Sequence, residues 1–292
     1  MPQNPLNHPT DIFPRIAVVP CRRCVAHEGI VPQWVDQIAT NIRDRGVMKN
    51  PIIVTRPMAS ASHKHIVIDG MHRFAAFQRL GIADIVVYQV DYADPTIRLE
   101  GWDALLFRPF RARRFLQRRF PAAKGYRIAS VTEAETAQAM IDAREAVVAA
   151  ADARGAIHVV RPARRSVTVD AIIRACEDVD LALDAEGLRP VYVADTLAWE
   201  DFAAAKAHGI VMRPHYTKDE ILERTVARRL FPRKSTRHLI PGRPLRVDVP
   251  LTILRAAIPL AAKNRLLNEH LRWCYAADRI RYYPESVFVF SD

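Results

Sequence analysis

Residues 66–81 read IVIDGMHRFAAFQRLG and join a short apolar strand to an amphipathic helix. The strand ends in Asp69 and Gly70, and His72 and Arg73 follow in the first turn of the predicted helix. Glycine lets a ligand approach the backbone closely, and the first N–H groups of a helix have no partner inside it. An acidic side chain, helix-start amides and two cationic or hydrogen-bonding side chains therefore converge on one point, as in a phosphate-binding turn.

The sequence around this turn predicts a compact α/β unit. Phe74, Phe77 and Leu80 recur at helical spacing, and Gly81 is a natural end for that helix. Runs of β-branched residues bounded by turns indicate the strands. The other expected elements are strands at 16–19, 52–54, 65–68 and 85–90, and a helix through Trp34, Val35, Ile38 and Ile42 that ends at Gly46.

Length and composition indicate a globular protein. The chain has 292 residues, 50% of them hydrophobic and 26% charged, which is enough for one large or two modest domains. No apolar run approaches the roughly 20 residues that span a bilayer. Residues 1–15, MPQNPLNHPTDIFPR, lack the charged-then-apolar order of a secretory signal. We therefore expect a cytoplasmic protein with no membrane partner.

The formal net charge of +11 favours anionic partners but does not choose between a nucleotide, a phosphorylated metabolite and DNA. Residues 107–119, FRPFRARRFLQRR, are strongly basic and carry interleaved phenylalanines. Such a segment can bind nucleic acid by phosphate pairing and stacking. The favoured interpretation is a solvated arm or helix that its phenylalanines anchor, close to a domain boundary.

The four cysteines are too few and too scattered for a disulfide framework. Cys21 and Cys24 form a lone CxxC without a second CxxC or a nearby histidine pair, so both a zinc site and a redox site are disfavoured. We expect reduced thiols near the end of a strand.

The middle of the chain alternates helical and strand patterns, which predicts a second α/β layer. Thr132 and Glu135 form a capping box that opens a long alanine-rich helix, expected to run to about Arg154. The elements expected after it are strands at 157–160, 191–194 and 210–212 and helices at 171–183 and 199–208. No catalytic constellation is evident there, so scaffold or partner contact is the preferred role.

The C-terminal part contains the other unusual cluster. A capping box at Thr217 and Glu220 opens a helix expected to end near Leu230. The loop PRKSTRHLIPGRP at 232–244 then places cations and hydroxyls consecutively at 234–238. This mixture suits an anion, and on residue types alone a surface basic loop is an equally good interpretation. A helix at 251–272 and a strand at 287–290 are expected to follow.

The first hundred residues resemble the ParB/sulfiredoxin-like superfamily, and within it the free serine kinases that include the serine kinase and regulator of siderophore gene clusters. The resemblance covers residues 16–102 and resumes at 217–251. It is carried by His27-Glu28, GVMKNPIIV from Gly46, IDGMHR at 68–73, VDY at 90–92 and FPRKSTRH from Phe231.

The implied fold is α/β (α+β), with a ParB/sulfiredoxin-like N-terminal domain, a second α/β region and a C-terminal helical segment. The implied organisation is a nucleotide- and substrate-binding domain at 1–107, a middle region of undefined role at 108–215, and a segment completing the active site at 216–292.

Met71 separates this chain from several relatives. Sulfiredoxins carry a catalytic cysteine in GCHR, where this chain has Met71, so sulfinic-acid reduction is disfavoured. Chromosome-partitioning ParB proteins carry GERR followed by a helix-turn-helix, which this sequence does not show clearly. The serine kinases usually carry DGHHR, so Met71 also changes one polar contact and bears on the choice of phosphate donor.

The resemblance assigns roles to the two clusters and expects them to meet in space. Glu28 would be the general base, and Asp69 would position the hydroxyl or a Mg²⁺ ion. The nucleotide or phosphate would be held by Gly70, Met71, His72 and Arg73, and the substrate or its phosphate by Trp102, Lys234, Ser235, Thr236, Arg237 and His238. Without the resemblance, Glu28 reads as a solvated acid, Asp69 as a helix cap, and His72 and Trp102 as core residues.

The implied activity is phosphorylation of free L-serine to O-phospho-L-serine, with ATP or ADP as donor and Mg²⁺. The product would feed cysteine, 2,3-diaminopropionate or siderophore-type biosynthesis. The alternative is a DNA-binding ParB-like transcriptional regulator, alone or combined with the kinase, and a nucleotide switch or nuclease is a third reading. A homodimer is left open.

Overall fold

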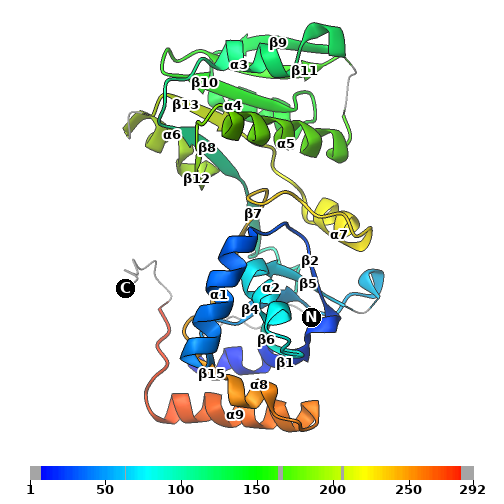
Figure 1. Cartoon of the computed structure of the whole chain (residues 1–292), viewed down its shortest axis with the longest axis vertical. Coiled ribbons are helices and arrows are strands. Elements are labelled where there is room, and N and C mark those ends of the chain that lie inside the picture. Colours follow the sequence, from blue (N-terminus) through cyan, green and yellow to red (C-terminus); the bar gives the residue numbers. More distant parts are fainter. Residues whose placement is uncertain (1–7, 63, 164–166, 205–206, 284–292) are drawn as a thin grey trace. The chain divides into compact units, whose positions relative to one another are not determined.

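The computed structural model describes residues 8–62, 64–163, 167–204 and 207–283, which form two compact units (Figure 1). Unit 1 comprises Met1–Arg98, Leu222–Leu230 and Ile240–Asp292, and unit 2 comprises Leu99–Ile221 and Phe231–Leu239. These boundaries differ from the expected segments 1–107, 108–215 and 216–292, because the chain returns to unit 1 twice after first leaving it.

Unit 1 is built on a five-stranded mixed sheet in the order β1-β6-β4-β5-β2. The β1–β6 and β4–β5 pairs are antiparallel, whereas β4–β6 and β2–β5 are parallel. Helices α1 and α2 pack against each other. The elements are β1 (Ile16–Pro20), β2 (Cys24–Ala26), α1 (Pro32–Arg45), β3 (Val47–Met48), β4 (Ile52–Thr55), β5 (His65–Asp69), α2 (Met71–Arg79), β6 (Asp84–Val90) and β15 (Val249–Pro250).

The strands and helices expected between residues 16 and 90 are present. Helix α1 ends where predicted, because Gly46 takes the left-handed conformation with φ +68°. Val35 and Ile42 of the expected stripe are buried, but Trp34 is 45% exposed. Trp34 therefore belongs to the edge of the helix face rather than to the core.

The single helix expected at 251–272 is two helices, α8 (Leu251–Arg255) and α9 (Leu260–Ala276). Pro259 divides them, because proline lacks an N–H donor and disfavours helical backbone at the residue before it. Helix α9 packs on β1 and α8 on β6. The strand expected at 287–290 lies outside the described residues.

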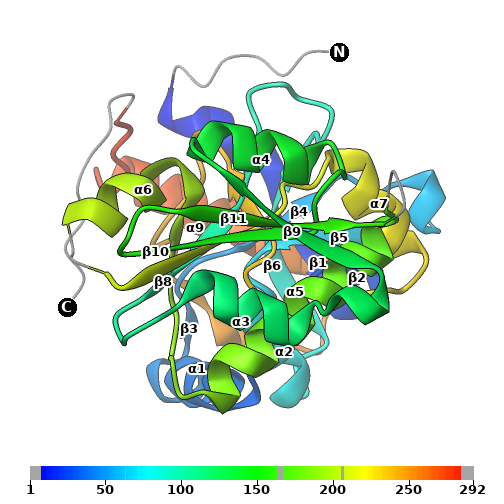
Figure 2. The same cartoon turned by 90° about the horizontal axis from the view of Figure 1, so that it is seen from above.

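Unit 2 is a six-stranded antiparallel sheet, β12-β8-β13-β10-β11-β9, with helices on both faces (Figure 2). Its elements are β8 (Trp102–Leu106), α3 (Ala112–Arg119), β9 (Tyr126–Val131), α4 (Ala134–Asp142), β10 (Val148–Asp152), β11 (Ile157–Pro162), α5 (Val169–Ala185), β12 (Val191–Ala194), α6 (Asp195–Ala204) and β13 (Gly209–Met212). Helix α7 (Lys218–Val226) spans the unit boundary, and β7 (Arg98–Glu100) pairs with β14 (Arg237–Leu239).

Alternate residues of the central strands face opposite helix layers. Val148 and Ala150 of β10 belong to the core under α3 and α5, whereas Ala149 and Ala151 belong to the core under α4 and α6. This double burial confirms a second α/β layer and explains one wrong prediction. The helix expected to run from the capping box at 132–135 to about Arg154 is α4, which ends at Asp142, and strand β10 lies in the second half of the expected range.

Two other helices differ from their expected ranges. Helix α6 begins at Asp195 instead of 199, and α7 ends at Val226 rather than near Leu230. The capping box of α7 is confirmed, because Thr217 N–H donates to Glu220 Oε2 (2.8 Å) and Glu220 N–H to Thr217 Oγ1 (3.1 Å). The box at 132–135 is not formed, because Glu133 is the N-cap residue of α4 and its side chain accepts no capping bond.

The basic segment 107–119 forms the anchored helix that was the favoured interpretation. Phe110, Phe115 and Phe120 are buried in the core of unit 2, and Phe107 is exposed. The three buried rings are therefore unavailable for stacking on nucleic-acid bases. No helix in the described part of the chain is both long and apolar enough to cross a bilayer.

Candidate functional site

The turn between β5 and α2 has the geometry that its sequence predicts. Gly70 is the N-cap residue of α2 and has φ +91°. A Cβ atom at this position would lie 2.7 Å from Arg73 Nη2 and 2.9 Å from Ile52 Cγ2. The left-handed backbone and the close guanidinium together restrict this position to glycine.

The Asp69 carboxylate faces two guanidinium groups. Its Oδ2 atom lies 3.2 Å from Arg73 Nη2 and 3.9 Å from Arg243 Nη1. Arg73 Nη2 also lies 3.2 Å from the carbonyl oxygen of Pro51, and Arg73 Nε is buried without a hydrogen-bond partner among the described residues. Two guanidiniums at a helix start suit a phosphate group.

Arg243 lies beside Asp69 but was not among the candidate residues selected from the sequence. It lies in the PGRP turn, five residues beyond the cluster at 234–238, and its side chain is half-exposed. The sequence marks this position only as a further arginine in an already basic loop. Nothing in the local pattern distinguishes it from its neighbours.

Glu28 follows β2 at the same edge of the sheet as Asp69. Ala26 of β2 pairs with Val67 of β5 in parallel register, and Glu28 and Asp69 each lie two residues further on. His27 between them is fully buried, with its Nδ1 2.6 Å from the carbonyl oxygen of Val67. Since the carbonyl accepts, Nδ1 carries a proton, and His27 ties the segment before Glu28 to β5.

Burial lowers the pKa of His27, while the negative charges of Glu28 and Asp69 oppose that shift. His27 is therefore neutral at physiological pH and within electrostatic reach of both carboxylates. In the sequence, His27 stands out only as part of the family resemblance. Its position makes it a structural support for both acidic residues.

His72 and Met71 both make contacts within unit 1. His72 Nε2 accepts a hydrogen bond from the Val31 N–H (3.0 Å), and its ring lies 5.3 Å from that of Trp34. It thereby holds the start of α1, three residues after Glu28. Met71 is the first residue of α2 and packs against the core of unit 1.

The donor set at this turn fits a magnesium ion that arrives with nucleotide phosphates. No group of three or more His, Cys, Asp or Glu side chains forms a metal cluster in the described ranges. Mg²⁺ commonly binds one or two carboxylates together with water and substrate phosphates, and Asp69 supplies one such carboxylate. A bound Mg²⁺ would neutralise phosphate charge there.

The residues of the second predicted cluster lie within unit 2. Trp102 Nε1 donates to the carbonyl oxygen of Thr236 (3.0 Å), and Lys234 Nζ lies 4.0 Å from the centroid of the indole ring. Arg237 forms an ion pair with Glu100, at the β7–β14 pairing. Ser235 is buried, as is Thr236. Direct contacts therefore bring Trp102 together with Lys234, Thr236 and Arg237.

The predicted residues thus divide between the two units. Glu28, Asp69 and residues 70–73 belong to unit 1, and Trp102 and residues 234–238 belong to unit 2. The expectation that the two clusters meet stays a prediction.

The CxxC cysteines stay protonated at the pH values at which catalytic cysteines ionise. Burial raises the pKa of Cys21 to about 11 and that of Cys24 to about 12. Both side chains are reduced and buried beside β2. Their burial disfavours thiolate chemistry, in agreement with the expected reduced thiols.

Comparison with solved structures gives the fold class, which is mixed α/β of the kind found in free serine kinases. SbnI with C-terminal truncation from Staphylococcus aureus matches with a TM-score of 0.69 and 18% identity, over 91% of this chain and 99% of that one. A mutant free serine kinase in complex with ADP matches with a TM-score of 0.65 and 18% identity, over 82% and 94%. These likenesses show the fold.

A curated relative is more similar in sequence over a shorter region. The ATP-dependent L-serine kinase of Staphylothermus marinus is 38% identical over 80 residues, or 27% of this chain. The match spans 31% of the length of that relative. No protein-family model matches the chain.

Proposed function

We propose that this protein transfers a phosphoryl group from a nucleotide to the hydroxyl of free L-serine, giving O-phospho-L-serine. The observation that carries the proposal is the strand-to-helix turn at Asp69–Arg73, with two guanidiniums on one carboxylate and Glu28 on the neighbouring parallel strand end. The sequence similarity to an ATP-dependent L-serine kinase supports ATP as the donor.

The proposed reaction assigns each chemical task to a residue. The Glu28 carboxylate accepts the proton of the serine hydroxyl as that oxygen attacks the terminal phosphorus, and the bond to the leaving nucleotide oxygen breaks. Arg73 and Arg243 compensate the charge of the phosphate oxygens, and Asp69 orients the hydroxyl or a Mg²⁺ ion. Trp102 and the donors at 234–238 hold the phosphorylated end of the product. O-phospho-L-serine made in this way would feed the biosynthesis of cysteine or of siderophore precursors.

The test is direct observation of the product. Purified full-length protein with Mg²⁺ and L-serine is given ATP or ADP, and phosphorus NMR follows the appearance of O-phosphoserine. Glu28→Gln should lower kcat by roughly 10²–10⁴-fold, because it removes the base without changing the side-chain size. Glu269→Gln on α9 is the matched control and should leave the rate unchanged.

Absence of phosphoserine with both donors would refute the kinase. Parallel reactions with L-threonine and L-homoserine define the acceptor, and a reaction without Mg²⁺ tests the metal requirement. A nucleotide that is hydrolysed without any acceptor would favour the nucleotide-switch reading instead.

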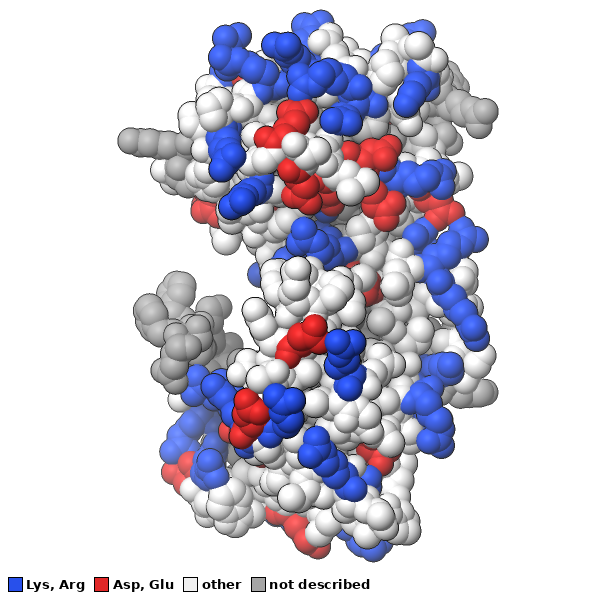
Figure 3. Space-filling view, in the orientation of Figure 1, with Lys and Arg blue, Asp and Glu red and all other residues white. Residues whose placement is uncertain are grey.

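A second candidate function, DNA binding, rests on the surface of α3. Arg113 and Arg114 of this helix and its N-cap residue Arg111 are exposed. Figure 3 shows Lys and Arg side chains gathered over this part of unit 2. Arg118 and Arg119 share Glu186 as an ion-pair partner. Since Phe110, Phe115 and Phe120 are buried, their rings cannot stack on bases, and this surface mainly offers charge to phosphates.

Fluorescence anisotropy with duplexes from the chain's own promoter region and with scrambled duplexes tests this candidate. Binding through phosphates alone should be equal for both duplexes and weaken steeply between about 50 and 200 mM salt. Substitution of Arg111, Arg113 and Arg114 by glutamate should abolish it. Preference for the promoter duplex would favour a transcriptional regulator.

A further inference from the structure

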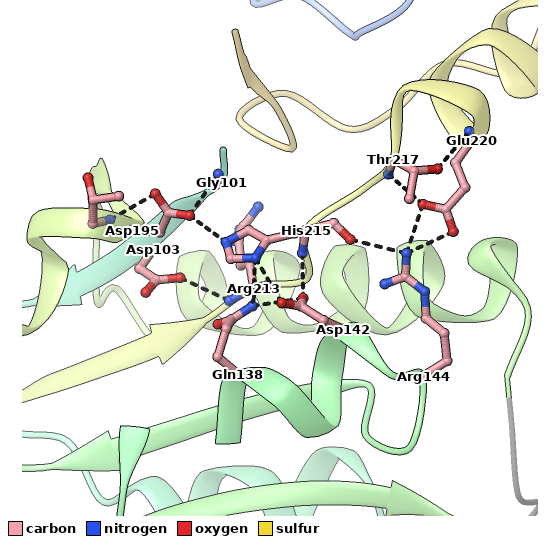
Figure 4. Close-up of polar contacts among 11 residues, drawn as sticks. Gly101, Asp103, Gln138, Asp142, Arg144, Asp195, Arg213, His215, Thr217 and Glu220 are labelled. Atoms are coloured by element: carbon pink, nitrogen blue, oxygen red, sulfur yellow. Dashed lines mark hydrogen bonds and ion pairs between the residues drawn. The ribbon is translucent and has the colours of Figure 1, made fainter. Parts of the chain in front are cut away.

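A charged cluster in unit 2 surrounds His215, in the segment that follows β13 (Figure 4). Its Nδ1 lies 2.9 Å from Asp142 Oδ2 at the end of α4, and its Nε2 bonds to Asp195 Oδ2 at the start of α6. The backbone N–H of His215 also donates to Asp142 Oδ1 (3.0 Å). A ring with a carboxylate at each nitrogen is held as a doubly protonated imidazolium.

The cluster reaches the beginning of β8 through Asp195. Asp195 Oδ2 also accepts a hydrogen bond from the Gly101 N–H (2.9 Å). A Cβ at position 101 would lie 3.0 Å from His215 Cδ2 and 3.3 Å from its Nε2. The imidazole therefore lies directly against the backbone of the residue before Trp102.

Trp102 links the residues around His215 to the loop at 234–238, which is the proposed substrate subsite. It pairs with Ala194, the residue before Asp195, in the β8–β12 ladder. Its indole N–H then bonds to the carbonyl of Thr236 and its ring lies under Lys234. Contacts thus run without interruption from the His215 ring to the loop at 234–238.

The segment that contains His215 also contacts the residues just before the loop at 234–238. Arg144 Nη2 donates to the carbonyl oxygen of His215 (3.1 Å) and bonds to both oxygens of Glu220 at 2.8 Å. Tyr216 packs edge-on against Phe231, with ring centroids 4.7 Å apart, and Phe231 is the first residue of the segment that leads to Lys234.

We propose that His215 is a positioning residue of the substrate subsite formed by Trp102 and the loop at 234–238. Through Asp195 it holds Gly101 in place, and thereby fixes the position of Trp102. The inference rests on the proposed function, since it names what orders the loop assigned to the phosphorylated product. Loss of the His215 ring should let Trp102 shift relative to Thr236, and the loop would then bind O-phospho-L-serine more weakly. The residue itself touches neither substrate nor nucleotide in this proposal.

The test compares His215→Gln and Asp195→Asn with His158→Gln in the full-length protein. His158 is a buried histidine of the same sheet that contacts Ser130 on β9, away from β8, and serves as the matched control. One readout is the indole N–H resonance of Trp102 in ¹H–¹⁵N NMR spectra, assigned with Trp102→Phe. The other is the Kd for O-phospho-L-serine by calorimetry, measured beside kcat and KM.

Both variants at 215 and 195 should shift the Trp102 resonance and weaken product binding by about three- to tenfold, equivalent to one hydrogen bond. His158→Gln should change neither readout. Should a variant lose thermal stability while the resonance and the Kd stay as in the wild type, His215 is only a fold-stabilising residue and the proposal is overturned. If the wild-type protein forms no O-phospho-L-serine from L-serine and nucleotide, the proposed function fails, whereas the Trp102 resonance still reports whether His215 positions Trp102.

Discussion

Two glycines of unit 1 have left-handed backbone conformations but different surroundings. An alanine Cβ at Gly70 would approach Arg73 Nη2 to 2.7 Å, whereas one at Gly46 would meet nothing within 4 Å. We expect Gly46→Ala to cost about 1 kcal/mol of unfolding free energy, from backbone strain alone. Gly70→Ala should cost about 2–3 kcal/mol and displace the Arg73 guanidinium.

Urea unfolding of the two variants measures the difference in free energy, and nucleotide binding measures the displacement of Arg73. Gly46→Ala should bind nucleotide as the wild type does, whereas Gly70→Ala should bind it more weakly. Equal stability losses in the two variants would mean that the guanidinium yields without cost.

His215 makes the stability of the fold depend on pH above neutrality. Hydrogen bonds to Asp142 and Asp195 raise the pKa of His215 from 6.5 to about 10 in the folded state. The protonated ring therefore stabilises the fold fully below pH 6.5, and this contribution is lost as the pH rises towards 10. The pKa values of Asp142 and Asp195 are lowered, so both remain charged over this range.

Urea midpoints of the wild type and His215→Gln at pH 7.5 and pH 10 test this term. The wild type should lose more stability between these values than the variant. Burial raises the pKa of the neighbouring Asp103 to about 7, so its titration is largely complete at the lower pH. Parallel pH profiles for the two proteins would show that the imidazolium contributes no stability.

At the scale of elements, those with a regular hydrophobic pattern were predicted correctly, whereas a strand buried on both faces was not. Strand β5 and helix α2 were found because Asp-Gly ends an apolar run and Phe74 and Phe77 recur at helical spacing. Strand β10 was not, because its run of alanines reads as helix, and burial on both faces overrides that propensity. Arg243 and His215 lie in irregular segments, where no period links them to the residues that they contact.

Helix α9 depends on a buried ion pair. Lys263 Nζ lies 2.7 Å from Asp84 Oδ2 at the start of β6 and 2.6 Å from the carbonyl oxygen of Leu254, and its side chain is nearly inaccessible. Lys263→Met should lower the free energy of unfolding by about 3 kcal/mol, because it leaves Asp84 largely buried and without its cation.

A double-mutant cycle separates the pair from the packing of the lysine stem. Lys263→Met combined with Asp84→Asn should recover part of the loss, since the uncompensated charge is removed. Urea unfolding monitored by circular dichroism gives the four free energies. Additive losses in the double variant would show that the two groups do not interact.

At the scale of the whole molecule, the chain passes between its two compact units four times, after Arg98, Ile221, Leu230 and Leu239. Composition does not mark these four boundaries, and the first of them, after Arg98, falls within strand β7. The sequence therefore predicted which residues form the two clusters, because local motifs carry them. It did not predict that unit 1 is assembled from three separate segments.

The proposed reaction draws on residues of both units, which hydrogen exchange can test without activity. With Mg²⁺, L-serine and a non-hydrolysable ATP analogue, amides at 66–81 and at 231–239 should both exchange more slowly, because each would contact the bound substrates. Strands β10 and β11 are the internal control and should be unaffected. Protection confined to 66–81 would leave the nucleotide site in unit 1 and remove residues 234–238 from the reaction.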